Sequence, residues 1–100
     1  MKTHFNKEEV TQRLIFYPDW KYDDEFLVRH YRFENFMQAF AFLTQVALIS
    51  EKFNHHPCIN FNYKDITLSI KTFDSGGITN KDFQWIEKIN QIPYKKVDEF

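Results

Sequence analysis

A helical pattern in the middle of the chain constrains the possible folds most strongly. Between Glu34 and Asn54 the apolar residues recur at three- and four-residue steps, which is the period of an amphipathic helix with a broad buried face. We predict that this face comprises Phe36, Ala39, Phe40, Leu43, Val46, Ala47 and either Ile49 or Ser50. Such a helix must pack along most of its length against another layer of structure.

Two runs directly after this helix have the period of strands. Apolar and polar residues alternate across 59–63 and again across 66–71, which is typical of antiparallel strands with one buried face. The apolar members are Ile59, Phe61, Tyr63, Ile66, Leu68 and Ile70. These strands are expected to supply half of the sheet that the central helix covers.

The remaining segments complete an α-β-β-α-β-β-α order. Asn6 and Glu9 have the spacing of a helix start, and Pro18 ends that helix. Segments 20–22 and 26–33 read as a hairpin around an acidic turn, and 79–92 reads as a closing helix before Pro93. We therefore predict an α+β fold with a four-stranded antiparallel sheet and helices packed on one face. Free edge strands of such a sheet can pair with another copy, which predicts a homo-oligomer.

Composition excludes several classes of protein. A chain of 100 residues with 43% hydrophobic residues suits one folded domain, residues 1–100, with 91–100 expected to form a loose tail. The net charge of −1 argues against direct binding of nucleic acid. The two glycines are adjacent, so no phosphate-binding loop is present. A single cysteine, without an export signal or a long apolar run, predicts a reduced cytoplasmic protein that does not enter the membrane.

The adjacent histidines at the end of the central helix are the main candidates for chemistry. Imidazole has an ordinary pKa of about 6.5 and exchanges protons near neutral pH without special tuning. Two charged rings side by side repel each other, which favours one neutral and one protonated ring. Pro57 biases His56 toward extended backbone, and successive extended residues point to opposite faces. Both rings can therefore reach one ligand only if the chain bends, and we expect that bend at His55.

Several motifs lie along the middle of the chain. They are Phe33-x-x-Phe36-x-x-Ala39-x-x-Phe42, Glu51-x-x-x-His55-His56-Pro57, Tyr63, Thr72-Phe73-Asp74 and Gly76-Gly77-Ile78-Thr79-x-x-Asp82. Together they resemble the pterin-4a-carbinolamine dehydratase family. The match covers about Leu27 to Ile89, and the paired His-His-Pro is its most specific part.

The resemblance implies an α+β subunit that assembles into homodimers or homotetramers. It implies an enzyme that removes water from 4a-hydroxytetrahydropterin to give quinonoid dihydropterin, in recycling of the pterin cofactor and with no metal or cofactor of its own. The implied catalytic residues are His55, His56 and Asp82, with His55 chiefly in acid-base work and His56 chiefly holding the pterin. The implied substrate-binding residues are Glu51, Pro57, Thr72 and Phe73.

Simpler structural roles are open for most of these residues. Thr79-x-x-Asp82 is also the spacing of a capping box at a helix start. Glu51 precedes His55 by four residues, where it either orients an imidazole or is a solvated carboxylate. Thr72 either contacts the pterin or occupies a strand end.

Phe73 departs from the family pattern, which has a histidine or a tryptophan there. Phenylalanine keeps an aromatic surface for stacking but has no proton to donate. An alternative function is therefore a low-activity or inactive member that binds a pterin or a protein partner. A third hypothesis, a metal site at His55 and His56 with Cys58, His30 or His4, lacks the ligand spacing of known zinc sites.

Overall fold

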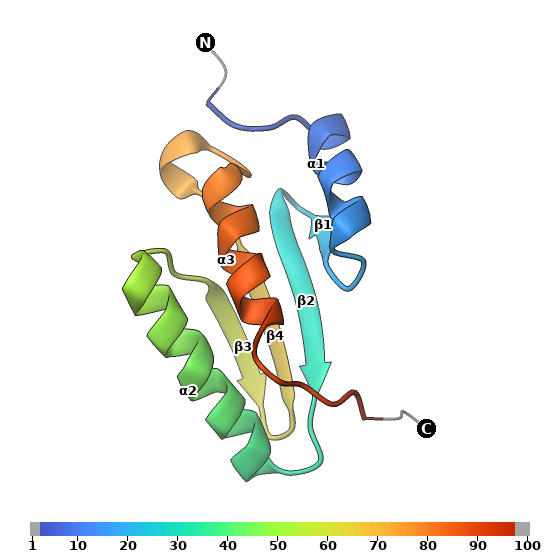
Figure 1. Ribbon diagram of the computed structural model, residues 1–100, viewed down its shortest axis with the longest axis vertical. Coiled ribbons are helices and arrows are strands. Elements are labelled where there is room, and N and C mark those ends of the chain that lie inside the picture. Colours follow the sequence, from blue (N-terminus) through green and yellow to red (C-terminus); the bar gives the residue numbers. More distant parts are fainter. Residues whose placement is uncertain (1–2, 98–100) are drawn as a thin grey trace.

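Four antiparallel strands form one sheet in the order β1-β2-β4-β3 (Figure 1). The computed structural model describes residues 3–97. The strands are β1 (Lys21–Asp23), β2 (Phe26–Arg32), β3 (Cys58–Asn62) and β4 (Asp65–Ile70). In the centre of the sheet, Leu27 of β2 lies opposite Ile70 of β4, and Tyr31 lies opposite Ile66. β1 and β3 are therefore the two edges.

Helices cover one face of this sheet. They are α1 (Lys7–Arg13), α2 (Phe36–Phe53) and α3 (Asn80–Asn90), and α2 and α3 pack against each other across the sheet (Figure 1). Two short 3₁₀ turns, Leu14–Phe16 and Phe73–Ser75, follow α1 and β4. The predicted element order and the α+β class are confirmed. Within the described residues, no helix is long and apolar enough to cross a membrane.

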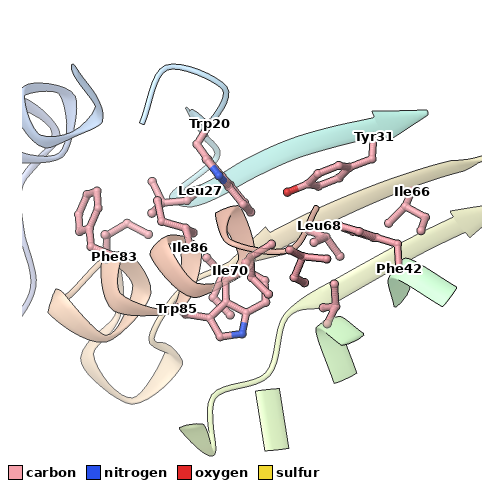
Figure 2. Close-up of a cluster of buried hydrophobic side chains, with 14 of the residues drawn as sticks. Trp20, Leu27, Tyr31, Phe42, Ile66, Leu68, Ile70, Phe83, Trp85 and Ile86 are labelled. Atoms are coloured by element: carbon pink, nitrogen blue, oxygen red, sulfur yellow. The ribbon is translucent and has the colours of Figure 1, made fainter. Parts of the chain in front are cut away.

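The core lies between the inner face of the sheet and the helices (Figure 2). The alternation predicted for β4 is confirmed, because Ile66, Leu68 and Ile70 are all fully buried. From α3, Phe83, Trp85 and Ile86 point into the same layer (Figure 2). Burial of these large apolar side chains supplies the main driving force for folding, at about 1.5–3 kcal/mol for each residue.

The predicted buried face of α2 is only partly right. Ala39 and Val46 are buried, but Phe36 and Phe40 are about half exposed, and Phe42 is the aromatic residue that enters the core. Ala47 is exposed as well. The cause is the position of α2 next to the edge strand β3. Phe36 and Phe40 lie against the ring of Phe61 on β3, with ring centroids 5.6 and 5.9 Å apart, so they cover the sheet edge instead of its centre.

The chain after α3 crosses the end of β2. Ile92 is buried, and the Tyr94 hydroxyl accepts a hydrogen bond from the Arg32 N–H at 3.0 Å and donates one to the Arg32 carbonyl at 2.9 Å. This part of the predicted loose tail is held against the sheet, and residues 98–100 lie outside the described residues.

Candidate active site

The end of α2 sets the direction of the histidine pair. Asn54 adopts a left-handed conformation with φ of 51°, and the His55 N–H donates to the Ser50 carbonyl at 3.0 Å. The buried Ser50 hydroxyl accepts a hydrogen bond from the Trp85 indole N–H at 3.1 Å, which ties this end of α2 to α3. The irregular residue is thus Asn54, one position before the bend that we predicted at His55.

His55 turns inward and meets Asp82. Its Nε2 lies 2.6 Å from Asp82 Oδ1. The His55 side chain is 13% exposed, and the Asp82 side chain is fully buried. The partners are 27 residues apart in the sequence and come together because α3 packs against α2. A short hydrogen bond between an imidazole and a buried carboxylate fixes the orientation and the tautomer of the ring.

Asp82 is itself held by the start of α3. Its Oδ2 accepts hydrogen bonds from the Thr79 backbone N–H and the Thr72 hydroxyl, both at 2.8 Å. Thr79 and Asp82 form a complete capping box, so the structural role weighed for this pair is confirmed. One carboxylate oxygen therefore serves the cap while the other pairs with His55.

His56 turns outward and meets Glu51. Its Nε2 lies 2.5 Å from Glu51 Oε2, and the two side chains are 52% and 77% exposed. The carboxylate expected to orient an imidazole therefore pairs with His56, not with His55, because the left-handed Asn54 ends the helical phase in which residues four apart are neighbours.

The loop between β4 and α3 places Thr72 and Phe73. Thr72 and Gly77 form an isolated antiparallel bridge, and Gly76 completes the reversal with a φ of +76°, a conformation that favours glycine. Thr72 is buried at Asp82, whereas Phe73 is 62% exposed and stands edge-on to Phe26, with ring centroids 5.9 Å apart.

The hydrogen-bond pattern leaves the same atom available on both imidazoles. Each ring uses Nε2 for its carboxylate, and within residues 3–97 no hydrogen bond to either Nδ1 is present. An ionised carboxylate only accepts, so Nε2 carries a hydrogen and Nδ1 of the neutral ring keeps its lone pair. Each ring can therefore take up a proton at Nδ1 and give it back, with a carboxylate supporting the positive charge.

Comparison with known proteins gives a family match over most of the chain. The family described as pterin 4 alpha carbinolamine dehydratase matches residues 3–92. The chain belongs to this family. The matched region contains both imidazole–carboxylate pairs and the loop that carries Thr72 and Phe73.

Individual relatives cover nearly the same region. A protein from Prochlorococcus marinus strain MIT 9312 is 42% identical over 85 residues, which span 85% of this chain and 88% of the relative. One from Chloroflexus aurantiacus strain J-10-fl is 38% identical over 87% of this chain and 94% of its own. Both are provisionally named pterin-4-alpha-carbinolamine dehydratases.

Two solved structures share the fold. A Brucella melitensis protein, described as a transcriptional coactivator/pterin dehydratase, superposes with a TM-score of 0.82 and 29% identity over 87% of this chain and 95% of its own. A pterin dehydratase-like protein, described as a RuBisCO assembly factor in the alpha-carboxysome, gives a TM-score of 0.62 at 21% identity over 72% of this chain and 86% of its own. The second likeness concerns the fold alone.

Most of the predicted site residues lie at one end of the α2–α3 pair. His55, Asp82 and Thr72 are joined by hydrogen bonds, and His56 and Glu51 form a second pair next to them in the chain. Pro57 is half-buried directly before β3. Sequence reasoning did not identify the Trp85–Ser50 hydrogen bond, for which no local sequence signal exists.

The structure also describes the side chains considered for metal binding. Within residues 3–97, no three His, Cys, Asp or Glu side chains are grouped so that they could hold a metal ion. His30 lies on the other face of the sheet, where it pairs with Thr67 and Asp65.

Proposed function

We propose that this protein dehydrates 4a-hydroxytetrahydropterin to quinonoid dihydropterin by acid-base catalysis at its histidine pair. The observation that carries the proposal is the pair of imidazole–carboxylate contacts on consecutive residues, inside the region that matches the family. Both contacts leave Nδ1 for the substrate.

The reaction needs two proton transfers. The bond between carbon 4a and its hydroxyl oxygen breaks, and the leaving oxygen receives a proton to become water. The neighbouring ring nitrogen loses its proton, and its electron pair forms the new carbon–nitrogen double bond. A protonated imidazole serves the first transfer and a neutral imidazole serves the second, and each positioned group of this kind contributes about 10²- to 10⁴-fold.

Burial distinguishes the two rings. The Asp82 carboxylate is fully buried and His55 nearly so, whereas the Glu51–His56 pair faces solvent. A carboxylate in a low-dielectric environment supports an imidazolium more strongly than an exposed one does. We assign His55 the main acid-base role and His56 the role of holding the pterin, assisted by Pro57 and by the exposed face of Phe73.

The test is turnover of freshly generated 4a-hydroxytetrahydropterin. The protein is expected to accelerate formation of quinonoid dihydropterin over buffer, His55→Ala is expected to lower kcat, and His56→Ala is expected mainly to raise KM. Circular dichroism of each variant controls for folding. The absence of any acceleration by the folded parent protein would reject the enzymatic proposal.

A second candidate function is supported by an exposed apolar surface on α2. Phe36, Met37, Phe40 and Leu48 are between 49% and 79% exposed, which is unusual for side chains of this size on one helix. A protein-binding or dimerisation module with little activity would use this surface, and Phe73 in place of a histidine favours that reading. Light scattering of the parent protein and of Met37→Glu distinguishes a self-associating protein from a monomer.

We also propose that the protein acts in the cytoplasm as a homodimer or homotetramer. Its single cysteine, Cys58, is exposed and unpaired on the edge strand β3, which suits a reducing compartment. Ile59 on the same edge is 45% exposed, and a second copy that pairs with β3 would cover it.

A further inference from the structure

A hollow lies at the opposite end of α3 from Asp82. It has a volume of about 320 Å³ and is lined by Asp19, Arg29, Tyr31, Asn90, Tyr94 and the chain that leaves α3. This volume is near the lower limit for small-molecule sites, about 300 Å³. None of the residues assigned to the dehydratase site lines it.

Hydrogen-bond donors converge on this hollow. The Arg29 guanidinium is held by a hydrogen bond from Nη1 to Asn90 Oδ1 at 3.0 Å, with its central carbon 4.4 Å from the centroid of the Tyr31 ring. Its side chain is only 15% exposed. A guanidinium has five N–H donors, so donors remain after the bond to Asn90 is made.

The Tyr31 hydroxyl is the unusual group in this hollow. Tyr31 is 1% exposed, and its hydroxyl has no hydrogen-bond partner within residues 3–97, although almost all buried polar groups have one. The hydroxyl points toward Trp20 (Figure 2), whose indole N–H donates to Asn90 Oδ1 at 2.9 Å. An unpartnered donor thus faces the cluster that holds Arg29.

Acceptors line the hollow next to Arg29. Asp19 Oδ2 forms an ion pair with Arg29 Nη2 at 3.6 Å, and its side chain is 62% exposed. The carbonyl end of α3 lines the hollow as well, and a helix C-terminus carries a partial negative charge. The hollow therefore presents one full charge of each sign, side by side.

We propose that this hollow binds a small zwitterion of the α-amino acid class. Its carboxylate accepts hydrogen bonds from Arg29 and the Tyr31 hydroxyl, and its ammonium group meets Asp19 and the carbonyl end of α3. A simple anion would add a negative charge beside Asp19 and the helix end, and a simple cation would add a positive charge beside Arg29. Only a ligand with both charges complements both members of the Arg29–Asp19 pair.

Nuclear magnetic resonance of the full chain tests this proposal without any pterin. The reporter is the Trp20 indole N–H, which donates to Asn90 at the hollow. The Trp85 ring packs on the Trp20 ring, with centroids 6.0 Å apart, so the internal control is the backbone N–H of Gly77, in the loop before the other end of α3. Titration with L-alanine into the millimolar range is expected to shift the Trp20 signal saturably and to move the Gly77 signal much less.

Acetate and ethylamine at the same ionic strength are the matched half-ligands. Both are expected to bind about tenfold more weakly than L-alanine or not at all, because each complements only one of the two charges. Equal shifts with acetate would overturn the zwitterion assignment, and no saturable shift with any of the three would overturn the site.

Tyr31→Phe is the decisive variant, because it removes the unpartnered hydroxyl and nothing else. It is expected to weaken L-alanine binding about three- to tenfold while thermal stability is kept or raised. Tyr17→Phe, which changes a tyrosine outside the hollow, is expected to bind like the parent. Unchanged affinity in Tyr31→Phe, or a loss of stability, would show that the hydroxyl has another partner and would contradict the proposal. Asp19→Asn is expected to weaken L-alanine binding without weakening that of acetate.

Discussion

Replacement of Asp82 by asparagine tests how the buried carboxylate acts on His55. In the parent protein Oδ2 accepts from the Thr79 N–H and the Thr72 hydroxyl, and Oδ1 faces His55 Nε2. The single oxygen of asparagine can replace Oδ2 and keep the helix cap, which leaves the amide NH₂ facing His55. An NH₂ group only donates, so Nε2 must become the acceptor and the hydrogen of the neutral ring moves to Nδ1.

The expected cost to catalysis is much larger than the cost to stability. With the wrong tautomer the neutral ring has no lone pair at Nδ1, and a loss of about 10²- to 10⁴-fold in kcat follows, or about 3–5 kcal/mol in the activation barrier. The two cap hydrogen bonds change from charged to neutral acceptors, and we expect the free energy of unfolding to fall by about 1–2 kcal/mol.

Thr79→Ala is the matched control. It removes the Thr79 hydroxyl, which accepts from the Lys81 N–H at 3.2 Å and is hydrogen-bonded to the Thr72 hydroxyl at 2.8 Å, at a cost of about 0.5–2 kcal/mol. The bond from the Thr72 hydroxyl to Asp82 is kept. The backbone N–H of residue 79 still bonds to Asp82, so the His55 tautomer should be unchanged and kcat should stay near that of the parent protein.

The assay combines stopped-flow detection of quinonoid dihydropterin with urea unfolding and nitrogen-15 spectra of the histidine ring. The spectra report the tautomer directly, which a loss of stability alone would not alter. A folded Asp82→Asn protein with kcat within about threefold of the parent would refute the assigned role of Asp82.

Three other predictions concern residues with different environments. Glu51→Gln should lower kcat/KM by no more than about tenfold, because the Glu51–His56 pair is exposed; a loss as large as that of Asp82→Asn would reverse the assignment of the two rings. Phe73→His should raise kcat by about tenfold or more if this position faces the substrate, with Phe73→Leu as the control for shape, and an unchanged rate in a folded protein would place Phe73 outside the site. Burial raises the pKa of Tyr31 above its ordinary value of 10.0, so the unfolded chain loses the phenolic proton first and the free energy of unfolding should fall as the pH rises above about 10. Urea unfolding at pH 8 and pH 11 should show a smaller fall for Tyr31→Phe than for the parent protein, and an equal fall in both would contradict the effect of burial.

The parts of the fold that sequence predicts well are those with a local physical signal. Alternation in β4 reports directly on the faces of a strand, and the Thr79–Asp82 capping box spans three residues. The buried face of α2 was predicted too broadly, because apolarity alone does not tell whether Phe36 and Phe40 face the centre of a sheet or its edge. That distinction depends on where β3 lies, which is a tertiary fact.

The site shows the same division between local and long-range information. The adjacent histidines indicate where the candidate site lies, and the family resemblance indicates its residues. Neither shows which carboxylate is hydrogen-bonded to which imidazole. Glu51 is four residues from His55 and five from His56, and the helix rule favours the first. The left-handed Asn54 breaks that rule, so Glu51 meets His56 and His55 turns to a carboxylate on α3.

The division of roles between the two rings therefore follows from how α2 ends. If α2 continued as a regular helix through His55, His55 would lie beside Glu51 at the surface, and the buried Asp82 carboxylate would bond only to the helix cap. The turn at Asn54, together with the Trp85–Ser50 hydrogen bond that fixes this end of α2 to α3, places one ring on a buried carboxylate and the other on an exposed one. Two identical side chains thereby acquire different electrostatic environments. That difference is the physical basis for proposing proton transfer for His55 and pterin binding for His56.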